Sequence, residues 1–316
     1  IKEVIVNMAD KDVSIIIATK NRQSDLQRCV RSVGEQTTIP NEVIIVDDGS
    51  LTSSYVQELE SKLDERTELI HTESDGPPGL SVARNTGIRE ASSEITLVVD
   101  DDTELGSTYI EQLVAWYERI DDSDFVGVAG YDSDQRDPSR LELLFRRIFL
   151  LGTDSWTVND IGMQSYAGEL EEPVKGHWMP GYNFSHRREV ILDHLFPQYN
   201  GGRESLEDIA VGWELKKEGK YCIIDPELPI QHHESVRNDS GYTIGVKNGK
   251  NRVRYFKDYG DSYRWPMFLW GMLGVVLLQV ATPIVNRRFY YHWTKMAGII
   301  VGTLTQLMTK KKEPTF

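Results

Sequence analysis

Short apolar runs alternate with longer amphipathic segments over the first hundred residues of this chain of 316 residues. Runs rich in valine and isoleucine are typical of buried parallel strands, and the segments between them have helical spacing. The pattern predicts strands over residues 13–18, 43–46, 69–71 and 95–99, and helices over 24–35, 53–63 and 80–91. Because strands that alternate with helices form doubly wound sheets, we expect an α/β fold with a mainly parallel sheet.

The pattern becomes less regular beyond residue 102. It predicts helices over residues 108–119 and 204–219, strands over 125–129 and 221–224, and an irregular segment over 154–172. The composition turns apolar after residues 258–264. We therefore predict a main domain over residues 1–258 and a C-terminal helical segment over residues 259–316.

The C-terminal segment contains two apolar stretches with aromatic residues beside them. Residues 266–285 carry no charge and are long enough to span a bilayer, whereas residues 296–308 are too short to do so. Two basic clusters follow the stretches, at Arg287-Arg288 and at residues 310–312. We expect this segment to associate with a membrane surface as interfacial helices. The alternative is a pair of core helices that cover the main domain.

Charge and cysteine content narrow the possible environments. The chain has 35 lysines and arginines against 49 aspartates and glutamates, which gives a formal net charge of −14. This balance argues against general affinity for nucleic acid, because phosphate binding requires an excess of basic residues. Cys29 and Cys222 are the two cysteines, and their separation predicts a reducing compartment without a disulfide framework. The N-terminus lacks the pattern of a secretory signal.

Polar residues follow three of the predicted strands. They are Thr19, Asn21 and Arg22 after the first strand, Asp47 and Asp48 after the second, and Asp100, Asp101 and Asp102 after the fourth. The carboxyl ends of parallel strands share one crevice, which is where such sheets bind ligands. Three adjacent carboxylates repel one another unless a cation lies among them, and Mg²⁺ and Mn²⁺ prefer oxygen ligands shared with phosphate. The alternative for the triplet is a solvated acidic loop.

The ordered set of motifs resembles the inverting glycosyltransferases of family 2, which have the GT-A fold. The segments that carry the resemblance are 14–22 (SIIIATKNR), 42–50 (EVIIVDDGS), 83–88 (ARNTGI), 100–102 (DDD), 181–188 (GYNFSHRR) and 207–208 (ED). The resemblance covers about residues 12–235. It implies a GT-A type, Rossmann-like sheet flanked by helices, to which the apolar C-terminal helices are an appendage.

The resemblance also implies roles for the residues that bind the donor and a divalent cation. The implied donor-binding residues are Thr19, Asn21, Arg22, Asp48, Arg84, Asp100 and Asp101, with Asp48 reading the nucleotide base and Arg84 near the diphosphate. Asp102 is the implied direct ligand of Mn²⁺ or Mg²⁺, and Asp100 lies nearer the ribose or the water on the metal. His232 or His233 is a further candidate ligand, and the alternative is that both lie at the surface.

The acceptor side is implied by the last two segments. Asp208 matches the catalytic base, and the implied acceptor-binding residues are Asn183, Glu207 and Trp213. A sugar hydroxyl is a poor nucleophile, so a positioned carboxylate must accept its proton. The alternative for Glu207 and Asp208 is an acidic first turn that favours the helix dipole. Trp213 replaces an arginine that is common in relatives, and it either stacks on an acceptor sugar or packs.

These features predict a cation-dependent transferase that uses a nucleotide sugar, with a UDP-sugar favoured. The apolar C-terminus suggests a lipid-linked acceptor, such as a glycan on polyprenyl or dolichyl phosphate. We then expect the enzyme to act at the cytoplasmic face of a membrane, in glycan or glycoprotein assembly. One alternative is a sugar-nucleotide pyrophosphorylase, although that class needs a glycine-rich loop after the first strand, and residues 18–22 contain no glycine. The other alternative is a catalytically silent scaffold recruited to membranes.

Overall fold

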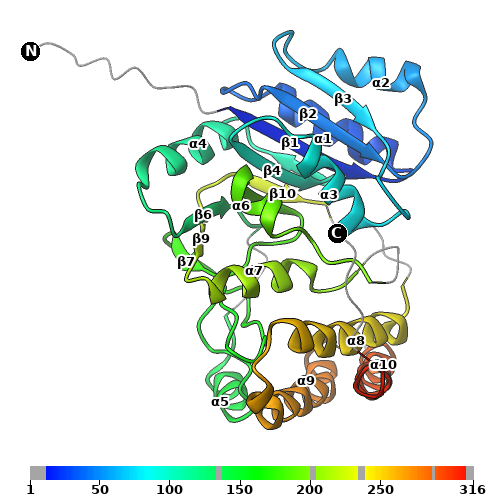
Figure 1. Cartoon of the computed structure of the whole chain (residues 1–316), viewed down its shortest axis with the longest axis vertical. Helices are drawn as coiled ribbons and strands as arrows, with labels where there is room; N and C mark the ends of the chain where they lie inside the picture. The colour runs from blue at the N-terminus through cyan, green and yellow to red at the C-terminus, as the bar shows by residue number, and fades with distance from the viewer. Residues whose placement is uncertain (1–11, 133–136, 200–203, 234–238, 287–288, 311–316) are drawn as a thin grey trace, which may run out of the picture.

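The computed structural model describes residues 12–132, 137–199, 204–233, 239–286 and 289–310. A five-stranded sheet lies at its centre, in the order β3-β2-β1-β4-β8 (Figure 1). The strands are β1 (Val13–Thr19), β2 (Glu42–Asp47), β3 (Glu68–Thr72), β4 (Ile95–Asp100) and β8 (Asn183–Arg187). β1 pairs in parallel with β2 and β4, β2 pairs in parallel with β3, and β8 runs antiparallel to β4. The predicted mainly parallel sheet is confirmed, but β8 was not predicted as a strand.

The other elements surround this sheet or extend it. They are α1 (Gln23–Gly34), α2 (Ser53–Glu60), α3 (Leu80–Glu90), β5 (Thr103–Leu105), α4 (Tyr109–Arg119), β6 (Phe125–Ala129), α5 (Arg140–Ile148), β7 (Val174–Gly176), α6 (Arg188–Asp193), α7 (Glu207–Lys217), β9 (Tyr221–Ile224), β10 (Ile230–His232), α8 (Gly241–Tyr259), the 3-10 turn η1 (Ser262–Arg264), α9 (Trp265–Asn286) and α10 (Phe289–Met308). There are two smaller sheets among the described residues. One pairs β10 with β5, and the other has the strand order β6-β9-β7.

β1, β2 and β4 are buried on both faces of the central sheet, which explains their continuous apolar runs. Successive side chains point to opposite faces, so Ile15 packs in one core cluster with Leu26 of α1, whereas Ile16 packs in another with Ile88 of α3. Gly87 allows α3 to approach the sheet closely, because a Cβ atom there would lie 2.3 Å from Ile16 Cγ2. These helices fix the carboxyl ends of β1, β2 and β4.

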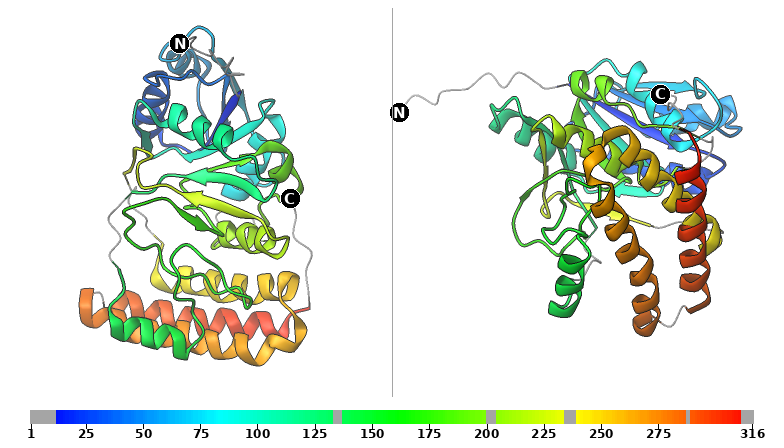
Figure 2. Two further views of the ribbon diagram at one scale, coloured as in Figure 1. Left: turned by 90° about the vertical axis from the view of Figure 1, so that its left-hand side faces the viewer. Right: turned by 60° about the horizontal axis from the view of Figure 1, so that its bottom comes forward.

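A layer of helices forms the end of the molecule farthest from β1, β2 and β3. It contains α5, α8, α9 and α10 (Figures 1 and 2). α8 and α10 pack backbone to backbone, since a Cβ atom at Gly245 would lie 2.1 Å from Lys295 O and one at Gly298 would lie 2.3 Å from Tyr242 O. The predicted boundary after residue 258 falls at the C-terminal end of α8 itself, so the contact of α8 with α10 joins the two sides of that boundary. The division into two domains stays a prediction.

None of the helices in the described part of the chain has the length and apolar character needed to cross a membrane. The basic residues Arg287, Arg288, Lys311 and Lys312 lie outside the described residues.

Candidate active site

The polar residues predicted after the strands meet at one edge of the central sheet. β1 lies between β2 and β4, and Thr19 and Ala18 at its end align with Asp47 of β2 and Asp100 of β4. This neighbourhood follows from the parallel pairing of three strands that end at the same level. The structure therefore brings the three predicted motifs to one crevice.

A cavity of about 300 Å³ opens beside these strand ends. Its lining includes Thr19, Lys20, Arg22, Asp48, Gly79, Asp100 and Asp101. The carboxylate of Asp48 is fixed by two donors, the hydroxyl of Ser74 and the backbone N–H of Gly79 at 2.7 Å. Asn21 is exposed at a positive φ of 55° and is not among the lining residues, but its side chain lies against Gly49 in the loop after β2.

The middle carboxylate of the triplet turns toward the protein. Asp101 accepts hydrogen bonds from Thr19 Oγ1 at 2.8 Å and from Arg22 Nη1 at 2.9 Å. Burial raises the pKa of Asp101 to about 6, against the opposing effects of Thr19 and Arg22. Asp101 thus anchors two residues that line the cavity, and Asp100 and Asp102 are left on the side of the candidate cation site.

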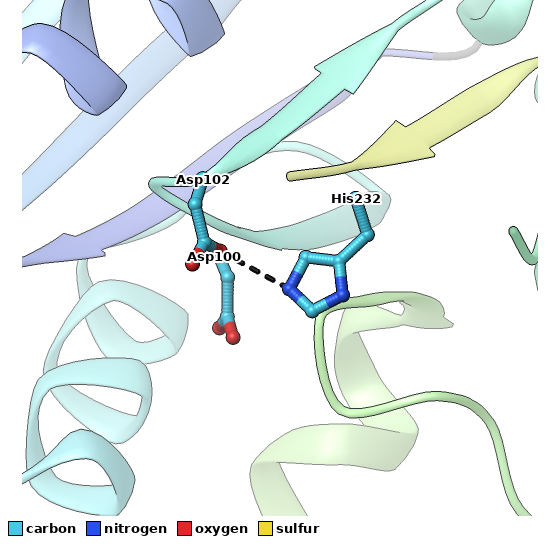
Figure 3. Close-up of side chains that lie close together, drawn as sticks. All are labelled: Asp100, Asp102 and His232. Atoms are coloured by element: carbon cyan, nitrogen blue, oxygen red, sulfur yellow. Dashed lines mark ion pairs between the residues drawn. The ribbon is translucent and has the colours of Figure 1, made fainter. Parts of the chain in front are cut away.

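Asp100, Asp102 and His232 form a cluster from the ends of β4 and β10 (Figure 3). Each offers a ligand atom within 4.8 Å of the others, and His232 Nε2 lies 3.2 Å from Asp102 Oδ1. The antiparallel pairing of β10 with β5 sets His232 opposite Thr103, directly after the triplet. Tyr182 stacks on the imidazole with ring centroids 4.3 Å apart. His233 instead points to Glu104, with Nε2 3.0 Å from Oε2.

The cluster fits a divalent cation of intermediate hardness. Two carboxylates and one imidazole suit Mn²⁺, and carboxylates with shared phosphate oxygens also suit Mg²⁺. Asp132 accepts a hydrogen bond of 2.9 Å from His232 N, which fixes the backbone that carries the imidazole. The structure therefore favours His232 over His233 as the histidine ligand.

Arg84 connects the strand ends to the N-terminus of α7. Its buried guanidinium donates to Asp100 Oδ1 at 2.8 Å and to Glu207 Oε1 at 3.1 Å, and it also donates to the carbonyl of Gly181. A guanidinium has donors in a fixed fork, so Arg84 holds these groups in one arrangement. Glu207 is therefore occupied by an ion pair, whereas the acceptor contact expected of it stays a prediction.

Asp208 lies beside Glu207 in the first turn of α7. It is half-buried and lines a second cavity, of about 280 Å³, with Arg84, Asp100, Tyr182 and Lys247. Burial, reinforced by the charge of Glu207, raises the pKa of Asp208 above the usual range of a carboxyl. A raised pKa suits a general base that works near neutral pH. Leu206 precedes this pair at a positive φ of 67°, which is rare for a leucine and marks local strain at a candidate site.

Two residues expected at the acceptor lie in the interior instead. Asn183 is fully buried, accepts a hydrogen bond from Tyr109 Oη at 2.6 Å and donates one of 2.7 Å to Gly130 O. Trp213 is buried on α7 and packs with Phe256 of α8. These placements do not favour contact with an acceptor. For Trp213 the structure shows packing, which was one of the two alternatives.

Several residues of these cavities received no role in the sequence analysis, among them two lysines and a tyrosine. Lys20 lines the cavity of Asp48, and Tyr182 and Lys247 line that of Asp208. Lys20 and Tyr182 stand inside the motifs at residues 14–22 and 181–188, so their place in these motifs was an available signal. Lys247 belongs to α8, which was not predicted, and the sequence around it carries no signal for the site.

Comparison with known proteins decides the family. The model of the family named Glycosyl transferase family 2 matches residues 14–190. The chain belongs to glycosyl transferase family 2. This match contains residues 14–19 of β1, all of β2 and β4, and the carboxylate triplet, whereas Asp208 and His232 lie beyond it.

Curated relatives match part of this family 2 chain. It is 32% identical over 201 residues to the putative glycosyltransferase EpsH of Bacillus subtilis, an alignment that covers 62% of the chain and 53% of the relative. It is 35% identical over 106 residues to the GalNAc(5)-diNAcBac-PP-undecaprenol beta-1,3-glucosyltransferase of Campylobacter jejuni, covering 32% of the chain and 33% of the relative. The chain thus spans about half or less of the length of these relatives.

Solved structures show that this family 2 chain has the GT-A fold. A mannosyltransferase from Pyrobaculum calidifontis, in complex with GDP-Man and Mn²⁺, aligns with a TM-score of 0.58 at 17% identity and covers 95% of this chain and 88% of that one. GalNAc-T7 with UDP, GalNAc and Mn²⁺ aligns with a TM-score of 0.55 at 17% identity, covering 89% and 58%. The GT-A expectation is confirmed.

Proposed function

We propose that this family 2 chain is an inverting, cation-dependent glycosyltransferase that moves a sugar from a nucleotide donor to an acceptor hydroxyl. One observation carries the proposal: the cavity of Asp48 and the cavity of Asp208 both have Asp100 in their lining. A nucleotide in the first cavity therefore places its diphosphate at Asp100, and its sugar beside Asp208. Sugar transfer requires this spatial order of nucleotide base, diphosphate, sugar and catalytic general base.

The donor side is assigned to the residues at the ends of β1, β2 and β4. Asp48, fixed by Ser74 and Gly79, presents a carboxylate that can accept hydrogen bonds from a nucleotide base. Lys20 and Arg22 supply positive charge in the same cavity. We favour UDP as the nucleotide because the carboxylate suits the N–H of a uracil. The two structural neighbours are complexes with GDP-Man and with UDP, which supports a nucleotide sugar in general.

Asp208 acts as the general base in the proposed reaction. The acceptor oxygen attacks the anomeric carbon, its proton passes to a carboxylate oxygen of Asp208, and the bond from the anomeric carbon to the diphosphate oxygen breaks. Attack from the face opposite the leaving group inverts the anomeric centre in one displacement. The raised pKa of Asp208 makes its carboxylate a stronger base than an exposed aspartate.

Asp100, Asp102 and His232 are the proposed ligands of Mn²⁺ or Mg²⁺. A divalent cation bound there supplies Lewis-acid stabilisation of the negative charge that collects on the diphosphate. Arg84 fixes Asp100 in the direction of this cluster, and Tyr182 fixes the plane of the His232 ring. The donor set therefore stays in place before the substrate arrives, as electrostatic stabilisation requires.

The acceptor is proposed to be a lipid-linked glycan at the cytoplasmic face of a membrane, in glycan or glycoprotein assembly. The observation in support is the exposure of large apolar side chains across the helical layer. They are Leu141, Leu144 and Ile148 on α5, Met267, Leu269, Trp270 and Leu273 on α9, and Phe289, Trp293, Ile300, Val301, Leu304 and Met308 on α10. Apolar patches of this extent are typical of membrane or protein contacts.

The decisive experiment measures release of UDP from a panel of UDP-sugars in Mn²⁺, with and without a polyprenyl-linked acceptor. Release that depends on the cation and on the acceptor supports transfer. A pyrophosphorylase instead forms a nucleoside triphosphate from the sugar nucleotide and pyrophosphate. A silent scaffold releases nothing from any donor, including GDP-sugars. Either result would overturn the proposal.

A further inference from the structure

A third cavity, of about 200 Å³, lies within the helical layer between α5, α8, α9 and α10. Its polar wall includes Arg252 of α8 and Lys295 of α10. Its apolar wall includes Val275 and Leu278 of α9 and Ile299 of α10. The pocket thus combines two cations with an aliphatic surface.

The two cations have no acidic partner among the described residues. Arg252 donates from Nη2 to Gln164 Oε1 at 2.8 Å, its Nη1 lies 3.5 Å from Met163 Sδ, and its buried Nε has no hydrogen-bond partner. No carboxylate of the described chain lies within 4.0 Å of Arg252 or Lys295. Arg146, in the same lining, is instead paired with Glu142 at 3.3 Å.

Arg252 and Lys295 are both half-buried. Even partial burial of uncompensated positive charge is unfavourable and calls for a physical reason. Burial lowers the pKa of Arg252 to about 10, which still leaves the guanidinium charged at neutral pH. Burial and the nearby charge of Arg252 lower the pKa of Lys295. An anion in the cavity would relieve both effects. A guanidinium with free N–H groups matches the oxygens of a phosphoryl group, and a lysine adds a point charge.

The cavity lies next to the one that contains Asp208. Leu206 lines both, so the two cavities adjoin at this side chain. Ser205 lines the cavity of Asp208, Asn248 lines the third cavity, and their side chains are hydrogen-bonded to each other. A ligand held by Arg252 and Lys295 can therefore extend toward the general base past Leu206.

We propose that the cavity of Arg252 and Lys295 binds the phosphoryl group of the acceptor lipid, with the lipid chain against Val275, Leu278 and Ile299. The inference rests on the proposed function, because it assigns a site to the acceptor of that reaction. It also accounts for the position of the cavity, in the helical layer whose helices α5, α9 and α10 expose large apolar side chains. The phosphoryl group then sits at a fixed distance from Asp208 and aligns the glycan that it carries.

The test measures binding of three probes to the full chain by calorimetry: farnesyl phosphate, farnesol and inorganic phosphate. Arg252→Gln and Lys295→Gln should each lower the affinity for farnesyl phosphate about tenfold. This is the scale of one lost hydrogen bond to a charged group. Arg31→Gln, on α1, removes an exposed cation far from the cavity and should leave the affinity unchanged. Thermal melting of each variant establishes that the fold is kept, and Lys295→Met serves if Lys295→Gln does not fold.

The three probes separate the sources of the phosphoryl group. Farnesol should bind at least about tenfold more weakly than farnesyl phosphate and should not respond to either substitution. Weak binding of inorganic phosphate supports a lipid ligand, whereas inorganic phosphate that binds as tightly as farnesyl phosphate overturns the lipid assignment. Unchanged affinity for farnesyl phosphate in both folded variants overturns the site itself.

Failure of this inference is distinguishable from failure of the proposed function. Asp208→Asn should abolish sugar transfer yet keep farnesyl phosphate affinity, because Asp208 does not line the third cavity. Transfer activity with no effect of Arg252→Gln on the KM for a polyprenyl-linked acceptor would contradict the inference alone. Absence of transfer with every donor would contradict the proposed function, while the calorimetric result still decides the binding site.

Discussion

Arg84 Nη2 donates a hydrogen bond of 2.8 Å to Asp100 Oδ1, which joins helix α3 to the last residue of strand β4. The same guanidinium also pairs with Glu207 beside the proposed base. The proposed donor, cation and acceptor parts of the site are thus held through one side chain that is nearly inaccessible to water.

Arg84→Lys is expected to weaken both donor binding and the fold. A lysine keeps the charge, but its single ammonium group cannot span Asp100 and Glu207 as the guanidinium fork does. We expect a loss of about 1.5–3 kcal/mol in the free energy of unfolding, the scale of a hydrogen bond to a charged group. Chemical denaturation and donor titration measure the two effects. Arg89→Lys, on the same helix, is the matched control, and equal stability of the two variants would contradict the role given to Arg84.

Asp102→Ala is expected to abolish transfer while the fold persists. The substitution removes a ligand from the cluster of Asp100, Asp102 and His232. Loss of the charge stabilisation provided by a cation amounts to several kcal/mol, more than about a hundredfold in rate. Turnover as a function of Mn²⁺ concentration provides the measurement, and Asp121→Ala, an exposed carboxylate elsewhere, provides the control. If Asp102→Ala turned over at the wild-type rate in Mn²⁺, the assignment of Asp102 as a cation ligand would be wrong.

Asp208→Asn is expected to bind the donor normally and to turn over at least about a hundredfold more slowly, the usual scale for losing a general base. Asparagine keeps the shape of aspartate but does not accept a proton at useful pH. Single-turnover kinetics and calorimetric donor affinity separate the two effects. Nearly full activity would assign the base to another carboxylate, with Glu207 the first candidate.

The rate is expected to rise with pH, with an inflection above the ordinary carboxyl range near about 4. Burial and Glu207 raise the pKa of Asp208, and only its ionised form accepts the proton. The free energy of unfolding is expected to change with pH in the opposite direction to the rate. A raised carboxyl pKa contributes stability that is fully present below the unfolded-state pKa and is lost as pH rises through the folded-state value. Asp208→Asn should remove this pH-dependent part of the melting temperature. A profile with its inflection at the unperturbed carboxyl value would exclude Asp208 as the base.

Leu141→Glu is expected to reduce binding to vesicles that contain anionic lipid. Leu141 is 77% exposed on α5, and a charge there disfavours burial among lipid chains. Vesicle flotation of the full chain measures the effect, and Gln57→Glu on α2 makes the same change in charge away from the helical layer. Truncation after Tyr263 is a poorer test, because it also removes α10 from its close contact with α8. Equal flotation of the two variants would argue against membrane binding through the surface that carries Leu141.

The crevice was predictable because parallel topology places strand ends together whatever the later part of the chain does. Thr19, Asp48 and Asp102 follow strands whose apolar runs are long and uninterrupted. The positions of Trp213 and Asn183 were harder to predict, because a single sequence does not show whether a side chain lines a cavity or fills the core. α8 was missed because its glycines lower intrinsic helix propensity, and the packing that overrides this cost involves a helix about fifty residues farther along the chain.

The close packing of α8 against α10 has a consequence for how the protein is made. α8 carries Lys247 of the Asp208 cavity, and its glycine face stays open until residues 289–308 arrive. During synthesis the sheet can form early, since domains fold from the N-terminus as the chain emerges. The proposed acceptor side of the crevice must wait for α10 to leave the ribosome. In a nascent chain, the cavity proposed for the nucleotide is therefore complete before the cavity proposed for the acceptor.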